Sequence, residues 1–348
     1  MVSTNGAPHG PRDPVADLRR IAYLLERDGA ETYKVRAFRN AASAIADLSV
    51  EDLAAMHPAW LQKIPQVGKT SAQVITEALA GATPTYLQKL ESSELPEMTD
   101  GAVGLFELLQ GDCHSHSDWS DGGSPIREMA EAAKELGHAY WALTDHSPRL
   151  TVAHGLNAER LRQQLEVVDE LNEEMAPFRI LTGIEVDILE DGSLDQEDEL
   201  LAQLDVVVAS VHSKLRMDGP AMTERMLRAI ESPHTDILGH CTGRIIVGRG
   251  RPPSSFDAEA VFAACARTGT AVEINSRPER LDPPEDLLAL ALSLDCVVTV
   301  DTDAHAPGQL EWQSFGCEKA ASAGVPPERI MNALPMEEFL SWTASHNK

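Results

Sequence analysis

The sequence predicts an α/β fold in which a parallel β-sheet or β-barrel follows a small all-helical domain. Two observations support this prediction. From Asp112 onward, short β-rich runs alternate with amphipathic helical stretches, as they do in repeated β–α units. Before that point, the apolar residues recur at helical spacing. The 348 residues are enough for two domains, each with a core of its own.

The predicted helical domain spans residues 1–85. Asp13 is placed to cap its first helix, in which the apolar residues follow a helical period. Further helical stretches follow, and the turn Ile-Pro-Gln-Val-Gly-Lys at 64–69 lies between the last two. Residues 86–110 contain prolines, glycines and a cluster of acidic side chains, so we expect a linker there. The predicted barrel domain then spans residues 111–348.

Seven runs in the second domain are predicted to be strands, and helical stretches separate them. Each run is short and rich in residues that favour strands. This alternation is typical of a parallel sheet or barrel. The predicted strands cover residues 111–117, 139–146, 179–188, 205–213, 236–240, 271–276 and 296–305.

Polar side chains gather at the C-terminal ends of these strands. In barrels of β–α units, each strand end delivers side chains to one common rim. Residues two apart in a strand face the same side, which suits the pair His114 and His116 and the pair Asp303 and His305. Six of the twelve histidines lie at such ends. The candidate metal ligands are His114, His116, Asp121, His146, Glu185, His212, His240, Asp303 and His305.

This set of ligands predicts a polynuclear metal site. All of its donor atoms are nitrogen or oxygen, which suits Zn, Mn or Fe and selects none of them. The five cysteines are odd in number and include no Cys-x-x-Cys pair, so we expect reduced thiols, no disulfide and no zinc finger. Cys113 and Cys241 flank candidate ligands and are expected to be packing residues.

Charge and hydropathy limit the kinds of partner that the protein can have. No run is apolar enough to span a membrane and the N-terminus does not resemble a signal peptide, so we expect a cytoplasmic protein without a membrane partner. The net charge of −26 argues against an extended nucleic-acid surface. However, residues 1–85 hold nine basic and nine acidic groups, and the remainder holds 20 basic and 46 acidic groups. The excess lies in the barrel domain, where bound metals can neutralise part of it.

The barrel domain resembles the polymerase and histidinol phosphatase (PHP) family. The matching motifs are D-x-H-x-H-S-x-x-S-D-G at 112–122, T-D-H at 144–146, G-I-E at 183–185, S-V-H-S at 210–213, G-H at 239–240 and D-x-D-A-H at 301–305. The resemblance covers about residues 110–340 and implies a distorted (β/α)7 barrel with three divalent metal ions. It also implies hydrolysis of a phosphoester by metal-activated hydroxide.

The resemblance assigns each ligand to a metal. One metal takes His114, His116, Glu185 and Asp303, a second takes Asp121, His146 and His305, and a third takes Glu185, His212 and His240. Glu185 is then the shared carboxylate, and we expect Glu185, Asp303, His212 and Arg149 to act in catalysis. Cationic residues that follow the strand-end motifs are expected to bind the phosphate, with His154 as a further contact. They are Arg149, Lys214, Arg244 and Arg277.

A narrower resemblance connects the chain to bacterial family X DNA polymerases. The stretches TDHSPRLTVAHGLN, LGHCTGRII and EINSRPERLD are similar to their PHP domain, and residues 1–85 to their helical lyase-type domain with its helix-hairpin-helix turn. Only about 25 residues separate the two regions, so the polymerase palm is missing. Such turns bind DNA phosphates through backbone N–H groups. Gln66 replaces the usual first glycine, and the candidate DNA contacts are Lys34, Arg36, Arg39, Gly68 and Lys69.

Three hypotheses about function remain open at this point. The first is a DNA 3′-end phosphoesterase, acting as a 3′–5′ exonuclease or as a 3′-phosphatase or phosphodiesterase. The second is a small-molecule phosphatase, such as one that acts on histidinol phosphate. The third is a DNA-binding repair accessory protein with a residual site. An amidohydrolase is a weaker fourth option, because Glu185 occupies the position where that chemistry often has a carboxylated lysine.

Overall fold

The structure is a computed structural model that describes residues 10–346. The chain divides into two compact units at the junction of Glu97 and Met98. The first unit is entirely helical. It contains α1 (Pro14–Arg27), α2 (Thr32–Ile45), α3 (Val50–Ala55), α4 (Pro58–Leu61), α5 (Lys69–Leu79) and α6 (Thr85–Glu91).

The core of the first unit follows the predicted helical periodicity. Asp13 caps α1, since its side chain accepts the N–H of Val15 at 2.8 Å. Ile21 and Leu24 of α1 pack with Phe38 of α2 and with neighbouring apolar residues in one buried cluster. The first unit therefore has its own hydrophobic core, as the length of the chain predicts.

The segment 86–110, which the sequence predicts to be a linker, is largely helical. It contains most of α6 and all of α7 (Asp100–Leu108). Ala102 and Leu105 of α7 are buried in the core of the second unit, against α14. Gly101 and Gly104 weaken the helical pattern in the sequence, but the buried apolar face compensates for them. The connection without helix is short, covering 92–99.

The second unit is built around seven parallel strands that follow each other in chain order. All seven predicted strands are present, and each is shorter than predicted. They are β1 (Gly111–Asp112), β2 (Tyr140–Leu143), β3 (Arg179–Asp187), β4 (Val206–Ser210), β5 (Ile237–Leu238), β6 (Ala271–Asn275) and β7 (Val298–Asp301).

The first and last strands meet just beyond their C-terminal ends and close the barrel. Ser115 and Ala304 form a parallel bridge, in which the N–H of His116 donates to the carbonyl of Ala304 at 2.8 Å. The N–H of Asp303 donates to the carbonyl of His114 at 2.9 Å. These bonds lie outside the regular strands, so the closure is irregular. The predicted distorted (β/α)7 barrel is confirmed.

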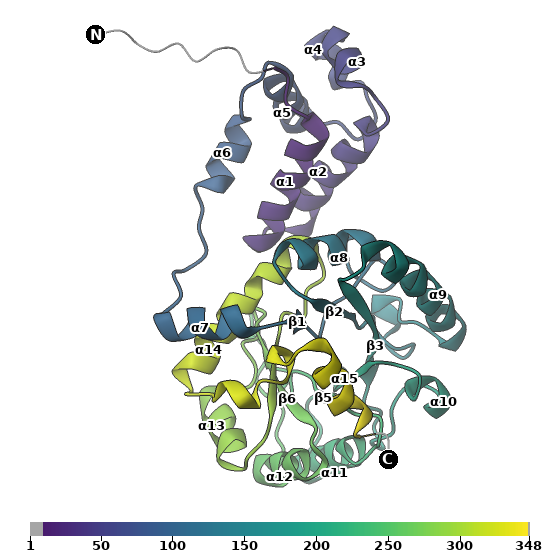
Figure 1. Cartoon of the computed structure of the whole chain (residues 1–348), viewed down its shortest axis with the longest axis vertical. Coiled ribbons are helices and arrows are strands. Elements are labelled where there is room, and N and C mark those ends of the chain that lie inside the picture. Colours follow the sequence, from purple (N-terminus) through teal and green to yellow (C-terminus); the bar gives the residue numbers. More distant parts are fainter. Residues whose placement is uncertain (1–9, 347–348) are drawn as a thin grey trace. The chain divides into compact units, whose positions relative to one another are not determined.

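Helices surround the barrel, as Figure 1 shows for the second unit. One helix connects each pair of neighbouring strands, and two more follow the last strand. These helices are α8 (Ile126–Glu135), α9 (Ala158–Met175), α10 (Asp198–Leu201), α11 (Gly219–Ile230), α12 (Ala258–Thr268), α13 (Glu285–Ser293), α14 (Gln313–Ser322) and α15 (Met336–Ala344). Within residues 10–346, none of the helices has both the length and the apolar character of a membrane span.

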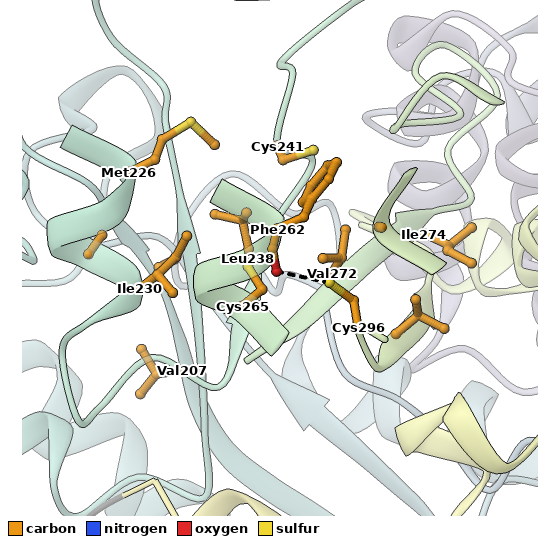
Figure 2. Packing of buried hydrophobic residues seen from close by; sticks show 14 of the residues in the cluster. Val207, Met226, Ile230, Leu238, Cys241, Phe262, Cys265, Val272, Ile274 and Cys296 are labelled. Carbon is orange, nitrogen blue, oxygen red and sulfur yellow. Dashed lines mark hydrogen bonds between the residues drawn. The ribbon is translucent and has the colours of Figure 1, made fainter. Parts of the chain in front are cut away.

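The main core lies between the strands and these outer helices. Figure 2 shows Phe262 and Cys265 of α12 packed among Leu238 and Val272 of the sheet. The thiol of Cys296 donates to the carbonyl of Phe262 at 3.2 Å. All five cysteines are free and buried, as expected for packing residues.

Helix α15 closes the end of the barrel where the strands begin. The ring of Phe339 packs on that of Tyr140, with centroids 5.2 Å apart. The same buried cluster contains Val206, Ile237 and Ala271, which are the first residues of β4, β5 and β6. Because this end is filled with apolar side chains, the polar site lies at the opposite, C-terminal end of the strands.

Candidate metal centre

The structure brings all nine predicted ligands together at the C-terminal end of the barrel. The rings of His116 and His305 are 4.2 Å apart, and those of His116 and His146 are 4.3 Å apart. On the other side of the cluster, the rings of His212 and His240 are 5.3 Å apart. Asp121 lies at the outer edge, with its Oδ1 3.5 Å from His146 Nε2 and 3.4 Å from His305 Nε2.

The ligands at the two ends of the domain lie just beyond the regular strands. His114 and His116 follow β1, and Asp303 and His305 follow β7, on either side of the bridge between Ser115 and Ala304. Asp303 has a φ of +53°, in the left-handed region that aspartate tolerates better than most residues. The barrel-closing bridge places the two extensions side by side. Both pairs reach the common cluster, as predicted, from positions just beyond the regular strands.

Glu185 occupies the centre of the cluster. This carboxylate is 1% exposed and belongs to β3. Its Oε1 lies 2.9 Å from His240 Nε2 and 3.1 Å from His212 Nε2. Its Oε2 lies 2.8 Å from His146 Nδ1 and 3.4 Å from His114 Nε2. One carboxylate therefore contacts histidines from both sides of the cluster.

The electrostatic field of the cluster favours positive charge at its centre. Burial alone would raise the pKa of Glu185, but the adjacent His212 and His114 hold this pKa well below its usual range. Burial would lower the pKa of His212, whereas Glu185 and Asp187 together outweigh burial and raise that pKa to about 9. The carboxylates thus recruit protons onto neighbouring histidines. Divalent cations would supply the positive charge that these carboxylates favour.

His116 provides a direct test of whether metal ions fit these residues. Its ring is fully buried, and neither ring nitrogen makes a hydrogen bond within the described part of the chain. Nε2 lies 3.5 Å from Asp303 Oδ1 and 3.6 Å from Glu185 Oε2. Burial lowers the pKa of His116 to about 3, and His305 and His146 act in the same direction. A neutral, buried imidazole without a partner is the form in which histidine binds a metal.

Four overlapping groups of side chains have donor atoms close enough to share an ion. They are His116 with Asp121, His146 and His305; His114 with Glu185 and His240; His114 with His116 and Asp303; and His146 with Glu185 and His212. Every predicted ligand belongs to at least one group. The grouping differs from the predicted sets, because His116 also joins the outer residues and His114 also joins His240.

Glu273, which the sequence analysis did not single out, holds three of these ligands in place. Its Oε1 lies 2.5 Å from His114 Nδ1, and both side chains are fully buried. Its Oε2 accepts the backbone N–H of His240 and, at 3.2 Å, the side-chain amide of Asn275. That amide also donates to Asp303 Oδ2 at 3.2 Å. A carboxylate behind a histidine fixes the tautomer that leaves Nε2 available to a metal.

Replacing Glu273 with glutamine should weaken metal binding by about 10- to 100-fold, because the amide is a poorer acceptor for His114 Nδ1–H. Titration calorimetry with the metal-free protein measures this change. Excess metal should restore turnover in this variant. Glu259→Gln, on the exposed start of α12, is the matched control. Unchanged affinity in Glu273→Gln would contradict the positioning role.

Asp145 plays a similar supporting role for the loop between His116 and Asp121. Its carboxylate accepts hydrogen bonds from the hydroxyl of Ser117 at 2.6 Å and from the amide of Gln164 at 2.6 Å. Ser120 also donates to it. The aspartate of the T-D-H motif therefore holds the loop, while the histidine of the motif faces the cluster.

The cluster forms the floor of a pocket of about 370 Å³. Of the five predicted substrate contacts, Arg277 lines this pocket, and the other four do not. Arg149 is exposed, and its backbone N–H donates to Asp195 at 2.5 Å, which turns the chain so that Leu150 faces the pocket. The expected catalytic role of Arg149 therefore has no geometric support.

The remaining three predicted substrate contacts are exposed or bonded outside the pocket. His154 is exposed, in a left-handed conformation, and its carbonyl accepts from Arg160 at 2.6 Å. Lys214 is 63% exposed and lies 3.9 Å from Glu190. The guanidinium of Arg244 donates to the carbonyls of Arg280, at 2.9 Å, and Leu281.

Arg280 lines the pocket, although the sequence analysis did not select it. Its Nε lies 3.2 Å from Asp303 Oδ2, and its buried Nη1 makes no hydrogen bond within residues 10–346. Arg277 approaches the same carboxylate, with Nη1 3.7 Å from Asp303 Oδ1. The two guanidiniums form one cationic wall next to the proposed ligands.

The helix-hairpin-helix turn at 64–69 contains one residue in the left-handed region. Gln66 has a φ of +71°, which explains why glycine is usual there. The N–H of Gly68 donates to the hydroxyl of Ser71 at 2.9 Å at the start of α5. The guanidinium of Arg39 donates two hydrogen bonds, of 2.6 and 3.0 Å, to the buried carboxylate of Glu26. Arg39 is therefore a structural residue. The other predicted DNA contacts that carry charge are exposed: Lys34, Arg36 and Lys69.

Comparisons with known proteins agree with both units. A PHP domain matches residues 112–277, and a helix-hairpin-helix domain matches residues 11–83. The chain is 40% identical over 250 residues to "DNA polymerase/3'-5' exonuclease PolX" of Bacillus subtilis (strain 168), which covers 71% of this chain and 44% of that protein. It thus spans less than half of that relative. It is 30% identical over 233 residues to a "Probable phosphatase" of Syntrophotalea carbinolica, covering 64% of this chain and 90% of the relative.

A solved structure also matches part of this chain at low identity. It is the histidinol phosphate phosphatase (HISK) of Lactococcus lactis, complexed with zinc, L-histidinol and phosphate. The identity is 20%, the TM-score is 0.43, and the match covers 62% of this chain and 94% of that one.

The seven-stranded barrel and its cluster of histidines and carboxylates define a metal-dependent phosphoesterase. The ions that this cluster binds are divalent metals. Within that class, the chain belongs to the PHP family, and it carries a helix-hairpin-helix domain in front of the barrel.

Proposed function

We propose that this protein hydrolyses phosphoesters at DNA 3′ ends, as a 3′–5′ exonuclease or as a 3′-phosphatase or phosphodiesterase. The observation that carries the proposal is the complete set of nine ligands in the same chain as a helix-hairpin-helix domain. The similarity to a relative named as a polymerase and 3′–5′ exonuclease supports DNA as the substrate. The complete set also argues against an accessory protein with only a residual site.

We infer that the cluster holds three divalent ions, chosen from Zn, Mn and Fe. The four overlapping ligand groups meet at Glu185, which belongs to two of them, and at His116, which belongs to the other two, and all donors are nitrogen or oxygen. When bound, such ions polarise phosphoryl oxygens and supply a nucleophilic hydroxide near neutral pH. Glu185 is the shared carboxylate in this arrangement, with Asp303 and His212 beside it. The five free cysteines fit a reducing compartment such as the cytoplasm.

The protein's own residues orient the phosphate in this proposal. Arg277 and Arg280 stand next to Asp303, where their N–H groups are positioned to bind phosphoryl oxygens. Leu150 and Ile245 form apolar parts of the pocket wall and shield the phosphate from bulk water. The first unit would hold the duplex or strand through Lys34, Arg36 and Lys69, with the α5 N-terminus at Gly68 directed at a phosphate.

A small-molecule phosphatase is the second candidate. The acidic barrel domain favours it, since the 41 acidic groups of residues 111–348 against 19 basic groups disfavour a long polyanion. A pocket of about 370 Å³ is also of a size that a small phosphoester can fill.

Incubation of the metal-loaded protein with 3′-phosphate DNA, unmodified single-stranded DNA and histidinol phosphate separates the two candidates. We expect release of phosphate or nucleotide from DNA, and none in His116→Ala. Lys34→Glu/Lys69→Glu should reduce DNA turnover about tenfold and leave histidinol phosphate turnover unchanged. Turnover of histidinol phosphate alone would favour the second candidate. Turnover of nothing, or equal turnover in His116→Ala, would refute both.

A further inference from the structure

A braced hairpin stands at the mouth of the metal pocket. We name residues 244–251 the arm. Ile245 and Arg251 exchange backbone hydrogen bonds of 2.9 and 2.8 Å, and the N–H of Gly250 donates to the carbonyl of Val247 at 2.9 Å. The tip requires glycine, because Gly250 has a φ of +62° and a Cβ there would lie 2.9 Å from the carbonyl oxygen of Ile245.

Two arginines fix the arm to the barrel. Arg251 donates to the carbonyl of Gly243 at 2.6 Å, and Arg244 donates to the carbonyl of Arg280 at 2.9 Å. The N–H of Ile246 donates to the carbonyl of Glu279 at 2.8 Å. Both Glu279 and Arg280 line the metal pocket. The arm is therefore an ordered element attached to the pocket wall.

The arm displays apolar side chains to solvent. Ile246 is 51% exposed and Val247 is 47% exposed. A second loop at the same pocket does the same, since Leu150 lines the pocket and Val152 is 86% exposed. Ile246, Val247 and Val152 are three of the five exposed large hydrophobic residues in the described part of the second unit. Such a concentration beside a pocket marks a binding surface.

The arm also carries positive charge in an acidic domain. Residues 242–256 contain Arg244, Arg249 and Arg251 and no Asp or Glu. Arg244 and Arg251 serve as braces, and Arg249 is exposed at the tip. Apolar side chains next to a cation suit single-stranded nucleic acid, whose bases can pack against aliphatic side chains while its phosphates meet the positive charge.

Neighbouring residues of the arm line two different hollows. Ile245 lines the metal pocket, whereas Arg244 and Ile246 line a second hollow of about 870 Å³ that also contains Phe315 and Lys319. Glu285 and Glu318 lie there as well. A ligand that reaches from one hollow to the other must cross the arm, so it is longer than a single small phosphoester.

We propose that the arm and Val152 bind the bases at the end of a DNA strand whose 3′ terminus lies in the metal pocket. This inference rests on the proposed function and specifies its substrate. Ile246, Val247 and Val152 contact the terminal bases, and Arg249 contacts a phosphate further from the end. The bases add binding energy that a base-free sugar-phosphate end does not provide.

Two oligonucleotides test this assignment, one with a natural 3′ end and one whose last two nucleotides are base-free analogues. The wild type should hydrolyse the natural end with a kcat/KM about tenfold higher. Ile246→Ser/Val247→Ser should bring the ratio close to one. The control Val103→Ser/Leu108→Ser removes two exposed apolar side chains from α7 and should keep the wild-type ratio.

Other results of this experiment would overturn either the role of the arm alone or the proposed function as well. Wild-type protein that hydrolyses both ends equally, or arm variants that keep the wild-type ratio, would overturn the role of the arm and leave the proposed function standing. No hydrolysis of either DNA by the wild type would overturn both. A change of oligomeric state in the arm variant, measured by light scattering, would instead make the arm an interface between copies. Arg249→Ala should lower the slope of log Kd against log salt concentration by about one.

Discussion

Glu185→Gln should lower kcat/KM for phosphoester hydrolysis by at least about a thousandfold. Glutamine keeps the size of the side chain but removes the charge that faces His114, His146, His212 and His240 at distances of 2.8 to 3.4 Å. Without that charge, the ligand groups that meet at Glu185 lose their common carboxylate. Steady-state kinetics and the metal content of the purified protein measure the effect together.

Glu190→Gln is the matched control for this substitution. Glu190 lies five positions later in the chain and is 57% exposed, so the same chemical change there should leave turnover and metal content unaltered. A Glu185→Gln protein that retains full metal content and full activity would refute the central role of this carboxylate.

Removal of the metal ions should lower the melting temperature of the barrel unit by at least about 8 °C. A ligand present at 1,000 times its Kd stabilises the folded state by about 4 kcal/mol, and each kcal/mol shifts the melting temperature of a unit this large by about 2–4 °C. The physical reason is that the metal-free cluster retains buried, unpaired groups such as the ring nitrogens of His116. Scanning calorimetry before and after chelation measures the shift.

The first unit supplies an internal control for chelation. It has a hydrophobic core of its own and none of the candidate ligands, so its melting transition should stay where it is. Chelation of the His116→Ala variant should produce a smaller shift, since that site already binds metal poorly. Equal melting temperatures of the barrel with and without chelator would contradict a metal-stabilised cluster.

Residues with a distinctive chemical type at a strand end were predictable from the sequence. Six histidines and Glu185 stand out against apolar runs, and the barrel geometry brings such ends together. Glu273 carried a weaker signal. It alternates with Val272 and Ile274 inside β6, fully buried, and an inward-facing carboxylate in the middle of a strand is recognisable only by that alternation.

Among the loop arginines, the predicted Arg277 lines the pocket, but three others were not predictable, because their direction depends on tertiary hydrogen bonds. Arg149 follows a strand-end motif but turns to solvent where its N–H meets Asp195, some 46 positions away. The guanidinium of Arg244 donates to backbone carbonyls of the neighbouring loop. Arg280 lies further from any motif and reaches Asp303 instead. The sequence contains the same residue type at all three positions and does not distinguish them.

Closure of the barrel beside β1 and β7 has a consequence for how the protein acquires its activity. The N–H of Cys113 donates to Asp301 at 2.8 Å across 188 positions of sequence, and Thr302 bonds Asp112 across 190. Contacts of such long range form late and slowly during folding. During synthesis, a nascent chain displays His114 and His116 long before Asp303 and His305 leave the ribosome. The two ligand groups that combine His116 with Asp303 or with His305 are therefore complete only once both ends of the domain have met.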